Sequence, residues 1–253
     1  MKMEELTQMA MSAIEASREE WFGLWEAQRD DGAMNRIMKA DWEASPRDSA
    51  DAIIDYYRTS KMWFVNTFAH GYRACLGLVN NDRSMVPSPD WQIVFKQYLP
   101  KGNPILDYGG GFWNDTALLA LDGYPVVQAE IEGPTTRMLE MVKAATPMKQ
   151  FLKILPVTSE FPLTDVYWGV VCFEVLEHLL NPKDFTKHLQ DHMSGGSPLA
   201  LSVSFGAPEH APYHVAANEP LGREGVWNKE MDEIGFAKIW KAETAERAVW
   251  RKK

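Results

Sequence analysis

The stretch PILDYGGGFWNDT, at residues 104–116, combines a carboxylate with three consecutive glycines. Its apolar beginning predicts a short buried strand that contains Asp107, and Gly109, Gly110 and Gly111 follow at once. Glycine lets the backbone turn with positive φ and approach a ligand closely. A strand that turns on glycines into a helix is typical of nucleotide-binding sites, so we expect such a ligand here.

The residues around this turn disfavour two common kinds of nucleotide site. A dinucleotide fingerprint needs a third glycine where the chain has Asn114, and no Lys-Ser/Thr pair follows the glycines as in a P-loop. Asp107 can instead accept hydrogen bonds from loop amides or from a ligand ammonium group. Glu130 ends the next predicted strand, where a carboxylate can accept both hydroxyls of a ribose. The two acids therefore indicate a ligand with a cationic amino-acid end and a nucleoside end.

A second group of reactive side chains lies in the segment EVLEH. Glu174, Glu177 and His178 share one face if a helical turn starts there, and His210 and His214 follow in a proline-rich loop. A histidine could serve as a general base, with Glu174, His178 and His214 as the acceptor-side catalytic candidates. Alternatively, the two glutamates with His178 and His214 could bind Mg²⁺, Mn²⁺ or Zn²⁺, or the segment could simply cap a helix. We do not favour a metal, because four ligands divided between a turn and a loop require a specific loop closure.

These residues must be positioned by elements that change in character near residue 100. Residues 1–100 have apolar side chains at helical spacing, whereas residues 101–253 alternate short apolar strands with helices, which predicts a parallel sheet covered on both faces. Ligands on such sheets bind at the carboxyl ends of the strands. The predicted strands are 104–108, 125–131, 151–157, 167–173 and 198–204, the predicted helices are 113–121, 134–145, 181–192 and 227–234, and a final antiparallel pair is predicted after residue 235.

The N-terminal hundred residues contain two long helical stretches and a shorter one before residue 100. Ser49 and Asp51 are candidate N-caps of the second stretch, in which Phe64, Phe68 and Tyr72 recur every four residues. Such a stripe most often packs against the core. The alternative is a cover over an acceptor site, for which the polar candidates are Tyr57, Arg58, His70 and Arg73.

Taken in order, three motifs resemble those of the class I S-adenosylmethionine-dependent methyltransferases. These motifs are DYGGGFW, the acid Glu130 and YWGVVCFEVLEHL, and the resemblance spans roughly residues 100–245. It is nearest to the subgroup that includes the ubiquinone-biosynthesis O-methyltransferases. The resemblance implies an α/β, Rossmann-like, doubly wound seven-stranded sheet with a helical N-terminal extension. It also implies S-adenosyl-L-methionine as cofactor, held by Asp107, Tyr108, Gly109, Gly110, Gly111, Glu130, Ile131, Val157, Thr158 and Phe173.

The chain departs from the family pattern at three places. Trp113 replaces the last glycine of the first motif and could narrow the methionine end of the pocket. Val157 and Thr158 stand where an acid often approaches the adenine, so backbone amides and apolar contacts are expected there. Gly169 replaces an aspartate that usually precedes the core of the fourth strand.

The amino-acid composition of the chain limits the kinds of molecule that it is expected to bind. The 253 residues carry a formal net charge of −9, which disfavours nucleic acid and anionic membranes. Only Cys75 and Cys172 are present, and no signal peptide or membrane span is visible, so we expect a cytoplasmic protein. The expected function is methyl transfer to oxygen or nitrogen of a small-molecule acceptor. The alternatives are metal-assisted RNA 2′-O-methylation and a non-catalytic cofactor-binding or scaffold subunit.

Overall fold

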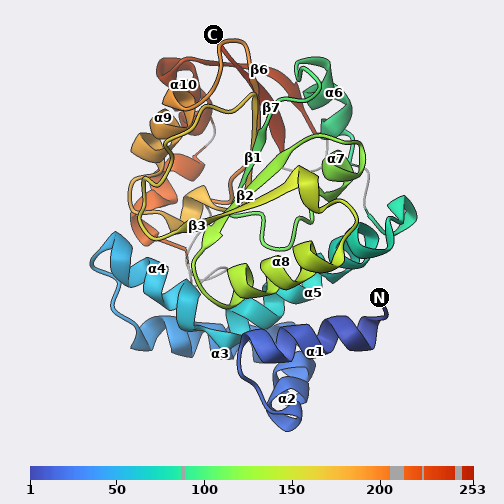
Figure 1. Ribbon diagram of the computed structural model, residues 1–253. Helices are drawn as coiled ribbons and strands as arrows, with labels where there is room; N and C mark the ends of the chain where they lie inside the picture. The colour runs from blue at the N-terminus through green and yellow to red at the C-terminus, as the bar shows by residue number, and fades with distance from the viewer. Residues whose placement is uncertain (87–88, 206–213, 224, 243–246) are drawn as a thin grey trace.

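The computed structural model describes residues 1–86, 89–205, 214–223, 225–242 and 247–253. Its centre is a seven-stranded sheet with the order β3-β2-β1-β4-β5-β7-β6, in which β7 is antiparallel to its neighbours (Figure 1). The predicted α/β fold is confirmed, including the antiparallel final pair. The strands are β1 (Ile105–Tyr108), β2 (Val126–Ile131), β3 (Leu152–Val157), β4 (Gly169–Phe173), β5 (Pro198–Ser202), β6 (Phe236–Lys241) and β7 (Ala248–Lys252).

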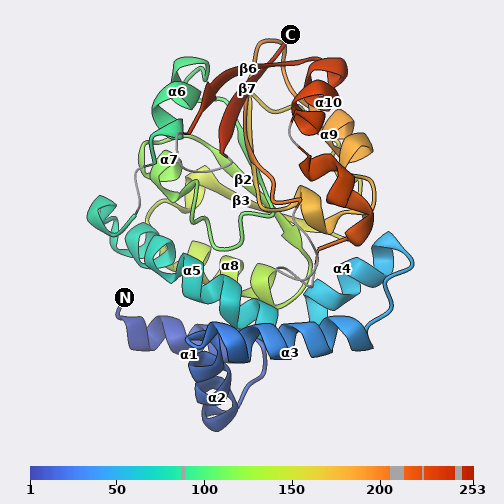
Figure 2. The same cartoon turned by 180° about the vertical axis from the view of Figure 1, so that it is seen from behind.

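Alternating side chains divide the core between the two faces of the sheet. Ile105 and Val171 belong to one hydrophobic cluster, and Leu106 and Cys172 belong to another. On the first face pack α6 (Trp91–Gln97), α7 (Ala117–Leu121) and α8 (Pro134–Ala145). On the second face pack α9 (Pro182–Asp191) and α10 (Val226–Ile234), as Figures 1 and 2 show from opposite sides. The sheet is therefore doubly wound, and its strand order switches between β1 and β4.

Close packing explains Gly169, one of the departures from the family pattern. A Cβ atom at this position would lie 2.7 Å from the Phe95 ring of α6 and 3.1 Å from Leu99. Any side chain here would push α6 away from the sheet, so the glycine serves helix packing.

Five helices precede α6, where two long helical stretches were expected. They are α1 (Met3–Ala13), α2 (Arg18–Gln28), α3 (Asp31–Ala44), α4 (Ala50–Thr59) and α5 (Lys61–Asn80). The first stretch breaks at Glu15, where φ is 53°, and the second breaks at Ser60, whose hydroxyl accepts a hydrogen bond from Trp63 N–H and caps α5. Ser49 caps α4 as predicted (3.2 Å to Ala52 N–H), but Asp51 does not cap it, because it lies inside the first turn.

The aromatic stripe of α5 packs against the sheet domain, in agreement with the core interpretation. Phe64 and Phe68 are buried and meet the ring of Phe112 edge to face, at centroid distances of 5.6 and 5.9 Å. One hydrophobic cluster includes Leu6 of α1, Phe68 of α5 and Leu139 of α8, so residues 1–100 share a core with the sheet. Helix α4 differs, because Ile53 and Tyr56 form a separate small cluster with Trp42.

Four short 3₁₀ helices complete the described chain: η1 (Arg83–Met85), η2 (Lys149–Phe151), η3 (Leu176–His178) and η4 (Ala216–Gly222). Within the described ranges, no helix combines the length and the apolar character that a membrane crossing requires.

Candidate active site

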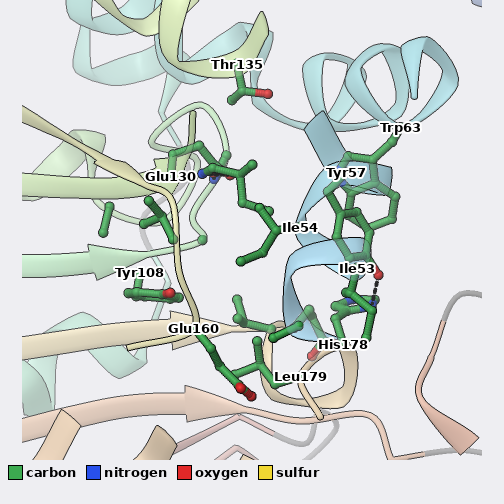
Figure 3. A pocket seen from close by; sticks show the side chains of 18 of the residues that line it. Ile53, Ile54, Tyr57, Trp63, Tyr108, Glu130, Thr135, Glu160, His178 and Leu179 are labelled. Carbon is green, nitrogen blue, oxygen red and sulfur yellow. Dashed lines mark hydrogen bonds between the residues drawn. The ribbon is translucent and has the colours of Figure 1, made fainter. Parts of the chain in front are cut away.

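A cavity lies at the carboxyl ends of β1, β2, β3 and β4, at the switch in strand order. Tyr108 and Glu130 approach it from the sheet, and Ile53, Ile54 and Tyr57 of α4 face them from the opposite side (Figure 3). The strand pattern predicted that a ligand would bind at the carboxyl ends of the strands, and the cavity lies there. The N-terminal helices contribute one wall of it.

The glycine turn also lines the cavity, and neighbouring residues enclose it tightly. Gly111 has a φ of 58°, and a Cβ atom on it would lie 2.6 Å from Thr67 of α5. Both the backbone angle and the neighbouring helix therefore require glycine at this position. Trp113, the next departure from the motif, also has a positive φ of 56°, but its side chain is fully buried in the core and does not line the cavity. The expectation that Trp113 narrows the pocket is not supported by this placement.

Asp107 lies beneath the turn and is not among the residues that line the cavity. It accepts a hydrogen bond from Thr116 Oγ1 (2.5 Å). With the Gln128 amide turned so that its nitrogen faces Asp107, that nitrogen donates to Asp107 (2.9 Å) and the amide oxygen accepts from Gly110 N–H (3.1 Å). Burial, together with the nearby charges of Asp115 and Glu130, raises the pKa of Asp107 to about 8, although the Thr116 hydrogen bond acts in the opposite direction. This position suits a carboxyl group that holds the turn in shape.

Glu130 connects the glycine turn to the end of β2 and lines the cavity. Its two oxygens accept hydrogen bonds from Gly111 N–H and Ile131 N–H, both at 3.0 Å. Burial raises its pKa to about 7, and these two hydrogen bonds act in the opposite direction. Each carboxylate oxygen can still accept a further hydrogen bond, so Glu130 is able to receive a pair of ligand hydroxyls.

The other predicted cofactor residues separate into two groups. Tyr108, Gly109, Ile131 and Val157 line the cavity, together with Glu130 and Gly111. Gly110, Thr158 and Phe173 do not: Thr158 is exposed, and the ring of Phe173 packs against Trp91 at 5.2 Å.

Sequence reasoning missed several residues of the cavity, of which Glu160 is the most polar. It stands three positions beyond the end of β3, past the two positions where an acid was sought. Its carboxylate accepts hydrogen bonds from the backbone (3.0 Å) and side-chain (3.3 Å) nitrogens of Asn181, which fix it beside the cavity. Extending the search for an acid by a few residues would have found it.

The EVLEH segment does not form the helical face that was predicted. Glu174 follows β4 with a φ of 52°, and only Leu176–His178 forms a short 3₁₀ turn. Glu174 and His178 nevertheless both line the cavity. Glu174 Oε2 accepts a hydrogen bond from Ser204 Oγ at 2.6 Å. Burial by itself would raise the pKa of Glu174, but this hydrogen bond helps to make the net shift of the pKa downward.

His178 is held among aromatic rings at the edge of the cavity. Its Nδ1 lies 2.8 Å from the hydroxyl of Tyr57, and the rings of Trp63 and His214 stand edge to face with it at 5.5 and 4.9 Å (Figure 3 shows the first contact). Among the polar acceptor-site candidates, Tyr57 lines the cavity. Arg58 instead donates to the backbone oxygen of Glu132, and His70 and Arg73 are exposed and outside the cavity.

Three of the four potential metal ligands converge. Candidate ligand atoms of Glu177, His178 and His214 all lie within 4.8 Å of one another, and Glu174 is not part of this group. Glu177 is fully buried; burial and the nearby charge of Glu174 raise its pKa to about 9. Two imidazoles and a carboxylate are a donor set that fits a divalent ion such as Zn²⁺ or Mn²⁺. The closure between turn and loop that such a site needs is therefore present for three ligands, while His210 lies outside the described residues.

The fold is similar to that of solved structures of a methyltransferase and of a cyclase. The structure is similar to magnesium protoporphyrin IX methyltransferase from Synechocystis PCC 6803 with bound SAH, with a TM-score of 0.53, 14% sequence identity, and coverage of 79% of this chain and 98% of that one. The same enzyme with bound SAM gives a TM-score of 0.51 at 15% identity, covering 82% and 99%. The (4+2)-cyclase SpnF gives 0.50 at 10% identity, covering 77% and 75%. No protein-family model and no curated protein matches the sequence.

Proposed function

We propose that this protein is an S-adenosylmethionine-dependent methyltransferase that modifies oxygen or nitrogen of a small-molecule acceptor. The observation that carries the proposal is the direct link between the glycine turn and the carboxylate at the end of β2, where Gly111 N–H donates to Glu130 at 3.0 Å. This pair lies at the topological switch point, in a cavity that the N-terminal helices cover.

The cofactor residues act by position and charge. Glu130 would accept the ribose hydroxyls, and the turn at Gly109–Gly111 would let the amino-acid end lie against the backbone. Ile53 and Ile54 of α4 exclude water from the opposite side. When bound, S-adenosylmethionine supplies both the methyl group and a sulfonium that already activates the leaving group.

The protein must then mainly orient the acceptor and, for a hydroxyl, accept its proton. His178 is the base candidate, because it lines the cavity and Tyr57 fixes its ring through Nδ1. Glu174 is held by Ser204 at the same edge and would orient the acceptor. If a divalent ion is present, Glu177, His178 and His214 would hold it, and it would lower the pKa of an acceptor hydroxyl.

Calorimetry with S-adenosylmethionine and its demethylated product tests this proposal. We expect both ligands to bind, and Glu130→Ala to weaken binding by about 1–3 kcal/mol, the range for losing hydrogen bonds to a charged group. Unchanged affinity in Glu130→Ala would show that the ribose lies elsewhere. The absence of any heat or thermal shift would favour the scaffold alternative.

The similarity to the cyclase SpnF supports one alternative function, in which the protein binds the cofactor but does not transfer its methyl group. A shared fold does not determine the reaction. Incubation with methyl-labelled cofactor and a mixture of small-molecule acceptors separates the two, because a protein that only binds the cofactor transfers no label. RNA 2′-O-methylation is disfavoured by the net charge of −9, and the same assay with small RNAs tests it.

A further inference from the structure

A second cavity lies on the other side of the Glu174–Ser204 pair. It is bounded by the end of β5, the N-terminal part of α10 and the β6–β7 pair. Three aromatic side chains line it, from Phe205, Trp227 and Trp250, and the first two rings meet at a centroid distance of 5.0 Å. The cavity therefore offers an apolar surface suited to a flat ring.

The charged side chains around this cavity are all cationic. Arg223, Lys238 and Lys241 line it, and no aspartate or glutamate does so among the described residues. Within the same part of the chain, none of the three has a carboxylate at ion-pair distance; the Lys238 ammonium donates to Asn228 Oδ1 and stands 4.6 Å above the ring of Trp250. Burial, followed by the charge of Lys241, lowers the pKa of Lys238. Three cationic side chains at one point of a chain with net charge −9 suit an anionic ligand.

A hydrogen bond links the linings of the two cavities. Ser204 lines the second cavity, Glu174 lines the first, and Ser204 Oγ donates to Glu174 Oε2 at 2.6 Å. A ligand in the second cavity would therefore reach the edge of the first beside the residues that face the acceptor.

We propose that the second cavity binds a ring-bearing organic anion and that this anion is the methyl acceptor, the latter part resting on the function proposed above. The ring packs against Trp227 and Trp250, and the anionic group pairs with Lys238 and Lys241. The acceptor atom then projects towards Glu174. This arrangement selects acceptors by charge and by ring, and only the acceptor atom would enter the first cavity, beside Glu174 and the cofactor.

The probe for this proposal is phenylacetate, with phenylacetamide as its neutral counterpart. The readout is the indole N–H signal of Trp227 in a ¹H–¹⁵N NMR spectrum, assigned as the signal that Trp227→Phe removes. We expect phenylacetate to shift this signal saturably and phenylacetamide to leave it in place. The double variant Lys238→Met/Lys241→Met should weaken phenylacetate binding about tenfold or more, as expected for losing charge-assisted contacts.

The matched control is Lys229→Met, on the same helix as Trp227 but with a 77% exposed side chain. This variant should bind phenylacetate like the parent protein. Equal shifts with phenylacetamide or inorganic phosphate, or unchanged affinity in the double variant, would overturn the anion-and-ring site.

An acceptor must also bind beside the cofactor, so saturating S-adenosylhomocysteine should not displace phenylacetate. Mutual exclusion would refute the acceptor role. This titration does not depend on catalysis. If the cofactor fails to bind while phenylacetate still shifts Trp227, the proposed function fails and the anion site stands.

Discussion

Cofactor binding is expected to release a proton from Glu130 near neutral pH. Burial raises its pKa to about 7, so roughly half of the free protein carries a protonated Glu130 at pH 7. Ribose hydroxyls would donate stronger hydrogen bonds to the charged form, in which both oxygens only accept, and this preference lowers the pKa of Glu130 and expels the proton. Affinity should therefore rise as the pH increases through about 7 and become constant at higher pH.

Glu130→Gln removes this titration and weakens the contact. A glutamine has one acceptor oxygen for the two backbone N–H groups that now bind Glu130, and its NH₂ group faces the other. We expect an affinity loss of about 1–3 kcal/mol, which corresponds to roughly 5- to 150-fold. Glu132→Gln, two residues along and exposed, is the matched control.

Calorimetry with S-adenosylhomocysteine at pH 7, in two buffers of different ionisation enthalpy, measures the released protons. The parent protein and Glu132→Gln should each release roughly half a proton, and Glu130→Gln close to none. Asp107 remains in all three proteins and does not line the cavity, and in Glu130→Gln its pKa loses only the contribution of the Glu130 charge. Equal proton release from Glu130→Gln and the parent would refute the assignment of the ribose to Glu130.

Further outcomes follow from the buried groups of the site. Asp107→Ala should lower the free energy of unfolding by about 1–3 kcal/mol in urea, whereas Asp107→Asn, which resembles the protonated acid, should cost less. Burial raises the pKa of Asp107 from 3.8 to about 8. Its contribution to stability is therefore fully present at low pH and is lost as the pH rises from about 3.8 towards 8. The free energy of unfolding should depend less on pH in Asp107→Asn. Trp113→Gly relieves a positive φ but removes a buried indole, so it should destabilise the protein by about 2–4 kcal/mol while leaving cofactor affinity unchanged, as calorimetry on the folded variant would show. His178→Ala should keep cofactor affinity within about twofold, because a contact to the acceptor contributes little to cofactor binding, and turnover should fall. We still expect chelator to leave turnover unchanged; a Zn²⁺ or Mn²⁺ site that disappears in both His178→Ala and His214→Ala would contradict that expectation.

The sheet was predictable because each strand is a short apolar run with a clear boundary. Gly109 and Glu130 mark the ends of β1 and β2, and the predicted strand ranges enclose the observed ones. The doubly wound seven-stranded sheet came from the family resemblance, and the structure confirms it. Helix boundaries in the N-terminal part were less predictable, since Ser60 reads as an ordinary helical position until its hydroxyl is seen capping α5.

The cavity walls were only partly predictable. Hydrophobic periodicity shows that Ile53 and Ile54 face something apolar, but it does not tell a core from a ligand cavity. Glu174 was expected on a helix because its spacing to Glu177 fits one, yet its positive φ places it before the turn. Local spacing cannot reveal such an angle in a non-glycine residue, because the surrounding tertiary contacts impose it.

The packing of α4 has a kinetic consequence for ligand exchange. This helix covers the cavity with Ile53, Ile54 and Tyr57, but it is anchored mainly by the small cluster with Trp42 and not by the two large clusters of the sheet. Detaching α4 therefore disturbs few buried contacts, which makes it a low-cost local opening. If a ligand as large as a nucleoside enters and leaves through this opening, the observed association rate should reach a plateau at high ligand concentration. The residence time of the product would be set by how often α4 detaches, so substitutions of Trp42 or Tyr56, which do not line the cavity, should change the dissociation rate.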